Sequence, residues 1–207
     1  MTVATHLAKS DLDEGLCLEI AEAGRFACDI ETSGLNPLEH RIGTVQIFAP
    51  EVGAVVLQVQ DRVPHNLCQL IEDTQVQKVF HHAMFDLRFI TTHWGATPKN
   101  ISCTKIASKI ICPNVDNKLH SLQSLLQRRL GVWISKDQRL TDWLTPELTA
   151  DQIGYATRDV EHLLQLLDSL TEDLTAAGLK ELFDQCIAFI PSRVQLEVGG
   201  WPDVFSY

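Results

Sequence analysis

Three strand-like runs near the start of the chain constrain its fold more than any other feature of the sequence. They cover residues 25–31 (RFACDIE), 41–49 (RIGTVQIFA) and 53–59 (GAVVLQV), and each is rich in apolar or β-branched residues. Only the turn-rich SGLNP and the pair Pro50-Glu51 mark the connections, and short connections of this kind indicate consecutive antiparallel strands. We therefore expect the three runs to be neighbours in one sheet.

After these runs the pattern is mostly helical. One more strand is predicted at residues 78–82 (KVFHH), which reads as buried and leads into a helix near Met84. Apolar residues at helical spacing predict helices at about residues 11–23, 66–72, 85–92, 104–111, 119–130 and 149–170. Strands in the first half, with helices between and after them, predict an α/β or α+β fold with a mixed central sheet flanked by helices.

The composition indicates one ordinary domain and limits the substrates that it can hold. With 207 residues, 45% of them hydrophobic, the chain can bury a substantial core. Its 17 basic and 27 acidic residues give a net charge of -10, the wrong sign for gripping long nucleic acid by its phosphates. A nucleic-acid substrate should therefore be short, with metal ions binding much of its phosphate.

Cysteines, histidines and the N-terminus exclude several other classes. The six cysteines form no CxxC pair and the histidines no HExxH motif, so neither a zinc site nor a disulfide framework is indicated. No apolar run reaches the roughly 20 residues that span a bilayer, and the first residues lack the pattern of a signal peptide. We expect a cytoplasmic protein that is not bound to membranes.

Two carboxylates, Asp29 and Glu31, interrupt the first apolar strand. Because side chains alternate along a strand, both lie on one face. Like charges at the end of a buried strand repel each other unless a cation or a proton compensates. A solvated strand end is the alternative explanation of this pair.

Two later segments add carboxylates and a tyrosine. Asp86 follows the strand KVFHH at the start of a helix, where an aspartate also complements the helix dipole. Tyr155 and Asp159 share one face of the last predicted helix, although a structural hydrogen bond would equally explain that pair. Four carboxylates can hold two Mg²⁺ or Mn²⁺ ions about 4 Å apart, which activate a water and stabilise the departing 3′ oxygen.

The segments around these residues resemble a known family of nucleases. DIETSGL, KVFHHAMFDL and YATRDVEHLLQL resemble the three motifs of the RNase D-like 3′→5′ exonucleases, in the tyrosine branch of the DEDD superfamily. The sister branch has a histidine five residues before the final aspartate, where this chain has Gly154. CTKIASKI and the ending CIAFIPSRVQLEVGGWPDVFSY are most similar to the nano-RNase C oligoribonucleases. The resemblance implies an RNase H-like exonuclease fold.

The same resemblance implies a role for each of the five residues. Asp29, Glu31, Asp86 and Asp159 would be the ligands of two divalent cations, and Tyr155 would orient the attacking water. With an ordinary pKa of about 10, a phenol is a hydrogen-bond partner at neutral pH rather than a free base. The implied activity is hydrolysis of dinucleotides and short oligoribonucleotides to nucleoside 5′-monophosphates. A broader RNase D-like or DNA-directed exonuclease, or an inactive nucleic-acid-binding member of the fold, is the alternative.

Substrate contacts are expected around the metal site. The resemblance suggests that Leu35 wedges against the bases and that the backbone near Thr32 meets the 3′ hydroxyl, with His81 and Phe85 in the second motif. Two polar, basic segments are candidates for the 5′ phosphate, one with Lys105, Ser108 and Lys109 and the other with Lys136, Gln138 and Arg139. The alternatives are structural: a loop anchor, a core histidine and solvated basic residues.

The end of the chain is unusually apolar. We expect residues 1–185 to form the catalytic domain and residues 186–207 an apolar C-terminal extension, with no separate accessory domain. An apolar segment of this size must be covered by its own domain or by another subunit. Similarity to nano-RNase C implies a closed homo-oligomer, with an octameric ring as the expected form.

Overall fold

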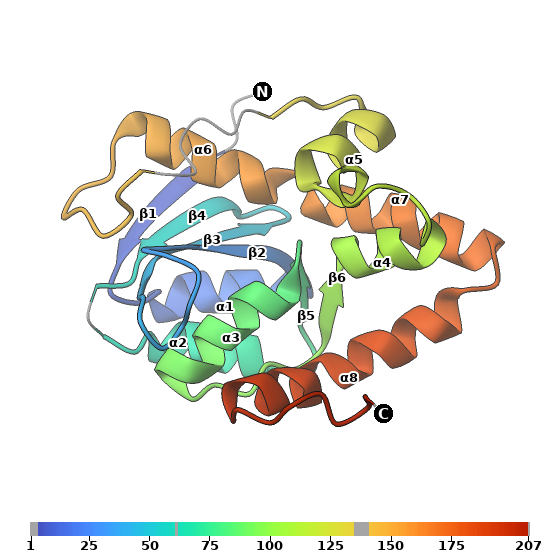
Figure 1. Ribbon diagram of the computed structural model, residues 1–207. Helices are drawn as coiled ribbons and strands as arrows, with labels where there is room; N and C mark the ends of the chain where they lie inside the picture. Colours follow the sequence, from blue (N-terminus) through green and yellow to red (C-terminus); the bar gives the residue numbers. More distant parts are fainter. Residues whose placement is uncertain (1–3, 61, 135–140, 207) are drawn as a thin grey trace.

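A six-stranded mixed sheet forms the centre of the computed structural model, which describes residues 4–60, 62–134 and 141–206 (Figure 1). The strands are β1 (Thr5–Lys9), β2 (Arg25–Thr32), β3 (Ile42–Ala49), β4 (Gly53–Gln58), β5 (Gln77–Phe80) and β6 (Ile101–Cys103), in the order β1-β4-β3-β2-β5-β6. The run β2-β3-β4 is antiparallel, as predicted, and the other neighbours pair in parallel. The expected α/β class with a mixed sheet is confirmed.

Helices cover both faces of this sheet. They are α1 (Glu14–Glu22), α2 (His65–Glu72), α3 (Ala83–Trp94), α4 (Thr104–Ile111), α5 (Leu122–Leu130), α6 (Ala150–Glu161), α7 (Leu163–Ala176) and α8 (Lys180–Val198). One core lies between the sheet and α1, α2, α3 and the later part of α8, and a second lies between the sheet and α4, α5 and α7. On the second face α6 packs over β2, β3 and β4. None of the described helices has the length and apolar character of a membrane span.

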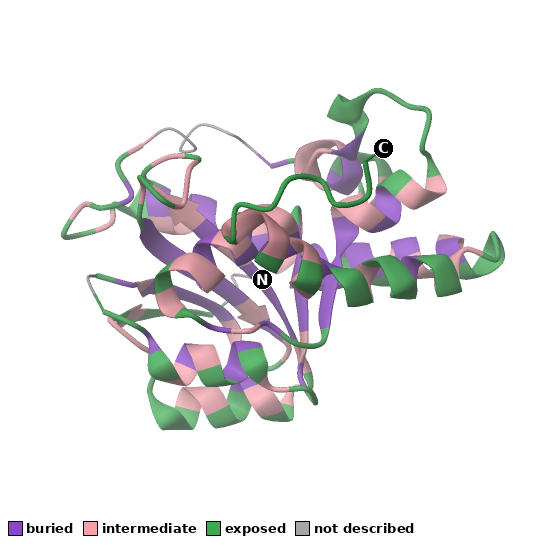
Figure 2. Ribbon diagram, turned by 60° about the horizontal axis from the view of Figure 1, so that its bottom comes forward, coloured by how far each residue is buried: buried purple, intermediate pink, exposed green. Residues whose placement is uncertain are grey.

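The strand β2 shows how the sequence divides between the two faces. Phe26, Cys28 and Ile30 are buried in the first core, whereas Ala27 is buried in the second. The central strands are buried along most of their length, and the helices expose their outer sides (Figure 2). The two carboxylates of β2 alternate with the first set of residues, so they lie on the face that α6 covers.

Two predicted helices are wrong in their extent. The helix expected at residues 149–170 is two helices, because the backbone leaves the helical region at His162 (φ −110°, ψ 2°), between α6 and α7. The helix expected at residues 119–130 is a 3₁₀ turn, η1 (Asn117–His120), followed by α5. The Ser121 side chain accepts a hydrogen bond from a backbone N–H of the next turn, which begins a new helix there.

Other elements differ from prediction for reasons of position. The strand expected at residues 78–82 ends at Phe80, because His82 has a left-handed φ of 74° and turns the chain into α3. No element was predicted at β1, β6 or α8. The strand β1 lies at the edge of the sheet and exposes most of its residues, and β6 has three residues, so neither carries a readable period.

The helix α8 runs through the position at which the C-terminal extension is expected to begin. It starts at Lys180 and ends at Val198, and it buries Ile190 and Val194 in the first core, next to α3. The chain's own fold therefore covers the inner side of this segment. Three large apolar residues beyond α8 stay exposed in the single chain: Trp201, Val204 and Phe205.

Candidate active site

A cleft of about 900 Å³ opens beside the end of β2. Its walls come from the loop after β2, the turn between β5 and α3, the start of α4, residues 141–143 and the inner side of α6. All four predicted metal ligands and Tyr155 line this one cleft: Asp29, Glu31, Asp86, Tyr155 and Asp159. Residues 130 positions apart in the sequence thus face a common space.

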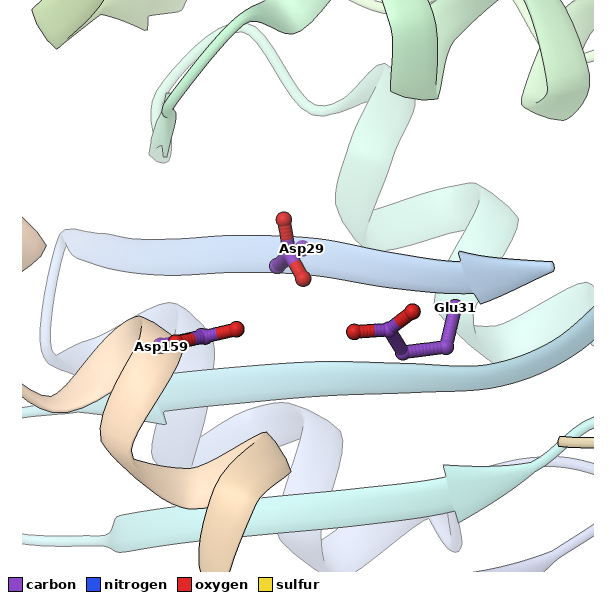
Figure 3. A group of neighbouring side chains, drawn as sticks. All are labelled: Asp29, Glu31 and Asp159. Carbon is purple, nitrogen blue, oxygen red and sulfur yellow. The ribbon is translucent and has the colours of Figure 1, made fainter. Parts of the chain in front are cut away.

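Three of the carboxylates form a tight group. Asp29 and Glu31 project from β2, and Asp159 projects from α6 towards them (Figure 3). One carboxylate oxygen from each residue lies within 4.8 Å of the others. Oxygen atoms from several carboxylates at this spacing are the ligands that hard divalent cations prefer.

Asp86 completes the set from the first turn of α3. Its side chain is buried, and its Oδ1 accepts a hydrogen bond from the Ile30 N–H at 3.2 Å, between the two carboxylates of β2. Burial raises the pKa of Asp86 well above its ordinary value, although the backbone hydrogen bonds act in the opposite direction. This bond ties α3 to β2 at the site.

The charges of the cluster act on one another. Burial raises the pKa of Asp29 well above its ordinary value, and the neighbouring carboxylates, first Asp86 and then Glu31, raise it further. Ionised carboxylates that are this close and this poorly hydrated need a compensating positive charge. The donor set therefore fits divalent cations, with Asp29, Glu31, Asp86 and Asp159 as the residues that would hold them.

Tyr155 reaches the cleft one helical turn before Asp159. Its side chain is 5% exposed and packs against Trp143, with ring centroids 6.0 Å apart. Burial, followed by the negative charges of Asp159 and Glu31, raises the pKa of Tyr155 above its ordinary value. The phenol therefore keeps its proton at neutral pH and can act as a hydrogen-bond donor.

The helix α6 is held in place by its own N-terminus. Thr149 and Gln152 form a capping box, and the buried Gln152 side chain also donates to the Asp142 carbonyl at 2.9 Å and to the Thr141 hydroxyl at 3.2 Å. Trp143 lies against Gly43 of β3 so closely that a Cβ atom there would be 2.3 Å from the Trp143 carbonyl oxygen. These contacts fix the wall that faces the carboxylates.

The loop after β2 brings two predicted substrate contacts to the cleft. The pairing of β2 with β3 shifts between Glu31 and Thr32, and such irregularities re-aim side chains at strand ends. The Thr32 hydroxyl donates to the Gly34 carbonyl at 2.6 Å, and Leu35 lines the cleft with 75% of its surface exposed. An apolar side chain this exposed is free to contact a base.

His81 and Phe85 line the cleft from the turn into α3. The Nδ1 atom of His81 is 2.8 Å from the Thr104 hydroxyl. Burial, followed by the positive charge of Lys105, lowers the pKa of His81 to about 3, so the imidazole is neutral at physiological pH. This histidine is therefore half-buried and borders the cleft, and its contact with substrate stays a prediction.

The two basic segments have different places. Lys105 lines the cleft, whereas Ser108 is buried with its hydroxyl 2.7 Å from the Nδ1 atom of His120. Lys109 lies one helical turn after Lys105, outside the residues that line the cleft. The second segment, with Lys136, Gln138 and Arg139, falls outside the described residues.

Several residues that line the cleft were not predicted to contact substrate. They are Ile30, Ser33, Gly34, His82, Leu122, Thr141, Asp142 and Trp143. Most belong to connecting segments whose position depends on tertiary contacts, so no spacing in the sequence marks them. Only the structure marks His82 as unusual, because it is a non-glycine residue with a positive φ beside the site.

Comparison with known sequences identifies one family over most of the chain. A family model described as 3′-5′ exonuclease matches residues 5–175. Ribonuclease D of Sphingobium indicum is 32% identical over 173 residues, which cover 82% of this chain and 43% of that protein. Ribonuclease D of Escherichia coli is 26% identical over 183 residues, 87% of this chain and 48% of that protein. The chain therefore spans about half the length of these curated relatives.

Solved structures of similar size match along the whole chain. NrnC of Brucella melitensis bound to pGG is 32% identical, with a TM-score of 0.91 and complete coverage of both chains. The same protein with bound Mg²⁺ has a TM-score of 0.90 and 99% coverage of both. A longer protein, Escherichia coli RNase D, shares the fold at 22% identity and a TM-score of 0.78, over 94% of this chain and 51% of that chain.

Proposed function

Because the chain belongs to the 3′-5′ exonuclease family, in its RNase D and NrnC type, we propose that it hydrolyses very short RNA from the 3′ end. The products would be nucleoside 5′-monophosphates, and two divalent cations, Mg²⁺ or Mn²⁺, would assist the reaction. One observation carries this proposal: four carboxylates and a protonated tyrosine, from three parts of the sequence, line a single cleft.

Each carboxylate has a place in the proposed metal site. Asp29, Glu31 and Asp159 would supply the shared oxygen ligands, and Asp86 would complete the set from α3. When bound, the cations supply activation of a water molecule and neutralisation of charge on the phosphate. A relative of the same size, NrnC, has been solved with Mg²⁺, which makes Mg²⁺ the first cation to test.

The chain's other residues would orient the substrate. Tyr155 stays protonated and can hold the attacking water in line with the scissile phosphate by a hydrogen bond. Leu35 offers an exposed apolar surface to the terminal bases, and Phe85 adds an aromatic one. Lys105 is the described basic residue that borders the cleft and is the candidate for the 5′ phosphate.

The net charge and the similarity to NrnC support a short substrate. A net charge of -10 leaves little attraction for a long polyanion, so affinity must come from contacts close to the cleft. NrnC, which matches this chain end to end, has been solved bound to pGG. A broader RNase D-like or DNA-directed exonuclease remains the second candidate, because the carboxylates specify the reaction and not the sugar. A cytoplasmic location belongs to the same proposal and agrees with six free cysteines.

Substrate length and sugar can be tested together. We expect turnover of a two-nucleotide RNA to exceed that of seven- and twenty-nucleotide RNAs. The longer RNAs have more phosphates outside the cleft, where the acidic protein offers them little attraction. Initial rates with 5′-labelled substrates at one metal concentration would measure this preference, and DNA of the same three lengths is the matched control. Equal rates across the RNA series would contradict the dinucleotide preference, and equal rates with DNA would favour the second candidate.

A further inference from the structure

Two polar residues of β3 lie beside the carboxylates of β2, on the same face of the sheet. In the antiparallel pairing, Gln46 is opposite Asp29 and Thr44 is opposite Glu31. Residues paired in this way have their side chains on the same face of the sheet. The amide and the hydroxyl therefore lie beside the two carboxylates, on the next strand of the sheet.

This pair is sealed from solvent. Both side chains are 0% exposed. On the side away from Asp29, Gln46 pairs with Val56. Val56 packs in a cluster with Trp143 and with Tyr155 of α6. The surroundings of Gln46 are thus apolar on one side and anionic on the other.

The hydrogen bonds of the pair are incomplete. Gln46 Nε2 donates to the Thr44 hydroxyl oxygen at 2.5 Å, whereas Gln46 Oε1 has no hydrogen-bond partner among the described residues. An unsatisfied buried polar atom destabilises the folded state, and a methionine of similar size would avoid that cost. Packing alone therefore gives no reason for glutamine at this position.

A role towards the carboxylates supplies such a reason. The Thr44 hydroxyl accepts the hydrogen bond from Gln46, so its own proton is directed away from the amide and is available to a second acceptor. Glu31 is directly opposite Thr44 on β2 and carries a carboxylate that can accept such a hydrogen bond. A neutral amide and a hydroxyl can hold a carboxylate in one orientation without adding charge to a cluster that is already strongly negative.

We propose that Gln46 and Thr44 are positioning residues that orient the metal-binding carboxylates, Glu31 through the Thr44 hydroxyl and Asp29 through the adjoining amide. The inference rests on the proposed function in so far as these carboxylates bind divalent cations. Neither residue touches the substrate cleft, so neither is a catalytic residue. Their effect is on the geometry of the ligands, and it should appear in metal affinity before it appears in anything else.

Four variants test the proposal. Thr44→Val removes the hydroxyl with almost no change of shape, Thr44→Ser keeps it, and Gln46→Met removes the amide. Gln77→Met is the matched control. Gln77 is a partly buried glutamine on β5 whose Nε2 donates to the Ser102 hydroxyl, and it pairs with Arg25 at the end of β2 that is far from the carboxylates. The readouts are the Mn²⁺ concentration that gives half of the metal-induced rise in melting temperature and, separately, kcat and KM for pGG.

We expect Thr44→Val and Gln46→Met each to raise the half-saturating Mn²⁺ concentration about tenfold, as loss of a group that orients metal ligands typically does. A fifth protein that combines Thr44→Val with Gln46→Met should be little worse than either single variant, since both substitutions act through one chain of hydrogen bonds. Thr44→Ser and Gln77→Met should titrate like the wild type. KM for pGG should change less than kcat at limiting metal.

A folded Thr44→Val protein with wild-type Mn²⁺ affinity would overturn the proposal, and this variant decides the question alone if Gln46→Met fails to fold. The metal titration also separates this proposal from the proposed function. A wild-type protein that Mn²⁺ stabilises but that leaves pGG intact would refute the activity, while the comparison of variants would still be valid. Absence of any Mn²⁺ effect on the wild type would overturn the positioning role.

Discussion

At the scale of single residues, the site is defined by negative charges that folding brings together at a cost. Asp29 meets Glu31, Asp86 and Asp159 in a poorly hydrated cleft, and its pKa is raised above the value it has in the unfolded chain. A carboxyl group whose pKa is raised by folding destabilises the folded state once the pH exceeds the pKa of the unfolded chain. The destabilisation grows until the pH passes the pKa of the folded state. Bound cations would remove that penalty.

Replacing Asp29 with asparagine should therefore have opposite effects with and without metal. In EDTA at neutral pH, we expect Asp29→Asn to melt higher than the wild type, by roughly 2–4 °C for each kcal/mol of repulsion relieved. The advantage should shrink as the pH falls, because protonation of Asp29 in the wild type achieves the same neutralisation. Thermal denaturation between neutral and mildly acidic pH measures both trends.

With Mn²⁺ present, the order should reverse, because the variant lacks a ligand and gains less stability from the cation. A metal-free Asp29→Asn protein that melts below the wild type at neutral pH would show that Asp29 is structurally required rather than electrostatically strained. Asp13→Asn is a suitable control, since Asp13 caps α1 away from the cleft.

Single residues also show what the sequence could reveal about the site. Alternation in β2 is enough to place Asp29 and Glu31 on one face, and helical spacing is enough to align Tyr155 with Asp159. The hydrogen bond from the Ile30 N–H to Asp86 could not be predicted, because it joins residues 56 positions apart and depends on how α3 meets the sheet. Direct contacts of this kind have no local pattern.

At the scale of elements, the strands that carry strong local patterns were predictable and the others were not. β2, β3 and β4 form a run of apolar strands with short connections, so their order and pairing follow from local sequence. The break at His162 has no glycine or proline to mark it, and buried apolar residues continue on both sides, with Val160 before it and Leu163 and Leu164 after it. Tertiary packing of α6 over the sheet and of α7 in the second core accounts for that break.

The contact between β3 and the wall of the cleft makes a prediction at this scale. A Cβ atom on Gly43 would lie 2.3 Å from the Trp143 carbonyl oxygen, so Gly43→Ala must displace the segment that faces the carboxylates. We expect a loss of roughly 1–3 kcal/mol in the free energy of unfolding, with a fall in kcat for pGG. Chemical denaturation and initial rates measure the two effects.

Gly154 provides the matched comparison. It lies in the middle of α6, where a Cβ atom would meet only the Arg158 side chain, at 3.4 Å. Gly154→Ala should stabilise the protein by roughly 0.5–1 kcal/mol and leave activity unchanged, because alanine is the better helix former. If both alanine variants behave alike, the close approach of Trp143 to β3 does not hold the cleft wall.

At the scale of the whole molecule, the uncovered apolar surface near the C-terminus suggests assembly. Phe205 is 69% exposed and Trp201 60%, although Phe205 makes an edge contact with Phe189 of α8 at 5.4 Å. Apolar groups gathered in this way typically mark a surface that a partner covers. The homo-oligomer implied by the resemblance to nano-RNase C therefore stays a proposal, and this surface is its candidate contact.

Light scattering coupled to size exclusion tests that proposal. We expect a mass well above the 23.2 kDa of one chain, and about 190 kDa for an octamer. Phe205→Ser should lower the mass, whereas Leu18→Ser, which alters an exposed leucine on α1, should leave it unchanged. A monomer at every concentration would contradict assembly through this surface.

The most direct test of the central claim is the identity and metal dependence of the products formed from pGG. The carboxylate cluster predicts that one molecule of pGG gives two molecules of guanosine 5′-monophosphate, because water attacks the bridging phosphate and the 3′ oxygen departs. Chromatography should show this product with Mg²⁺ or Mn²⁺, none in EDTA, and none with folded Asp29→Asn. A product carrying a 3′ phosphate, or undiminished cleavage by Asp29→Asn, would contradict the account.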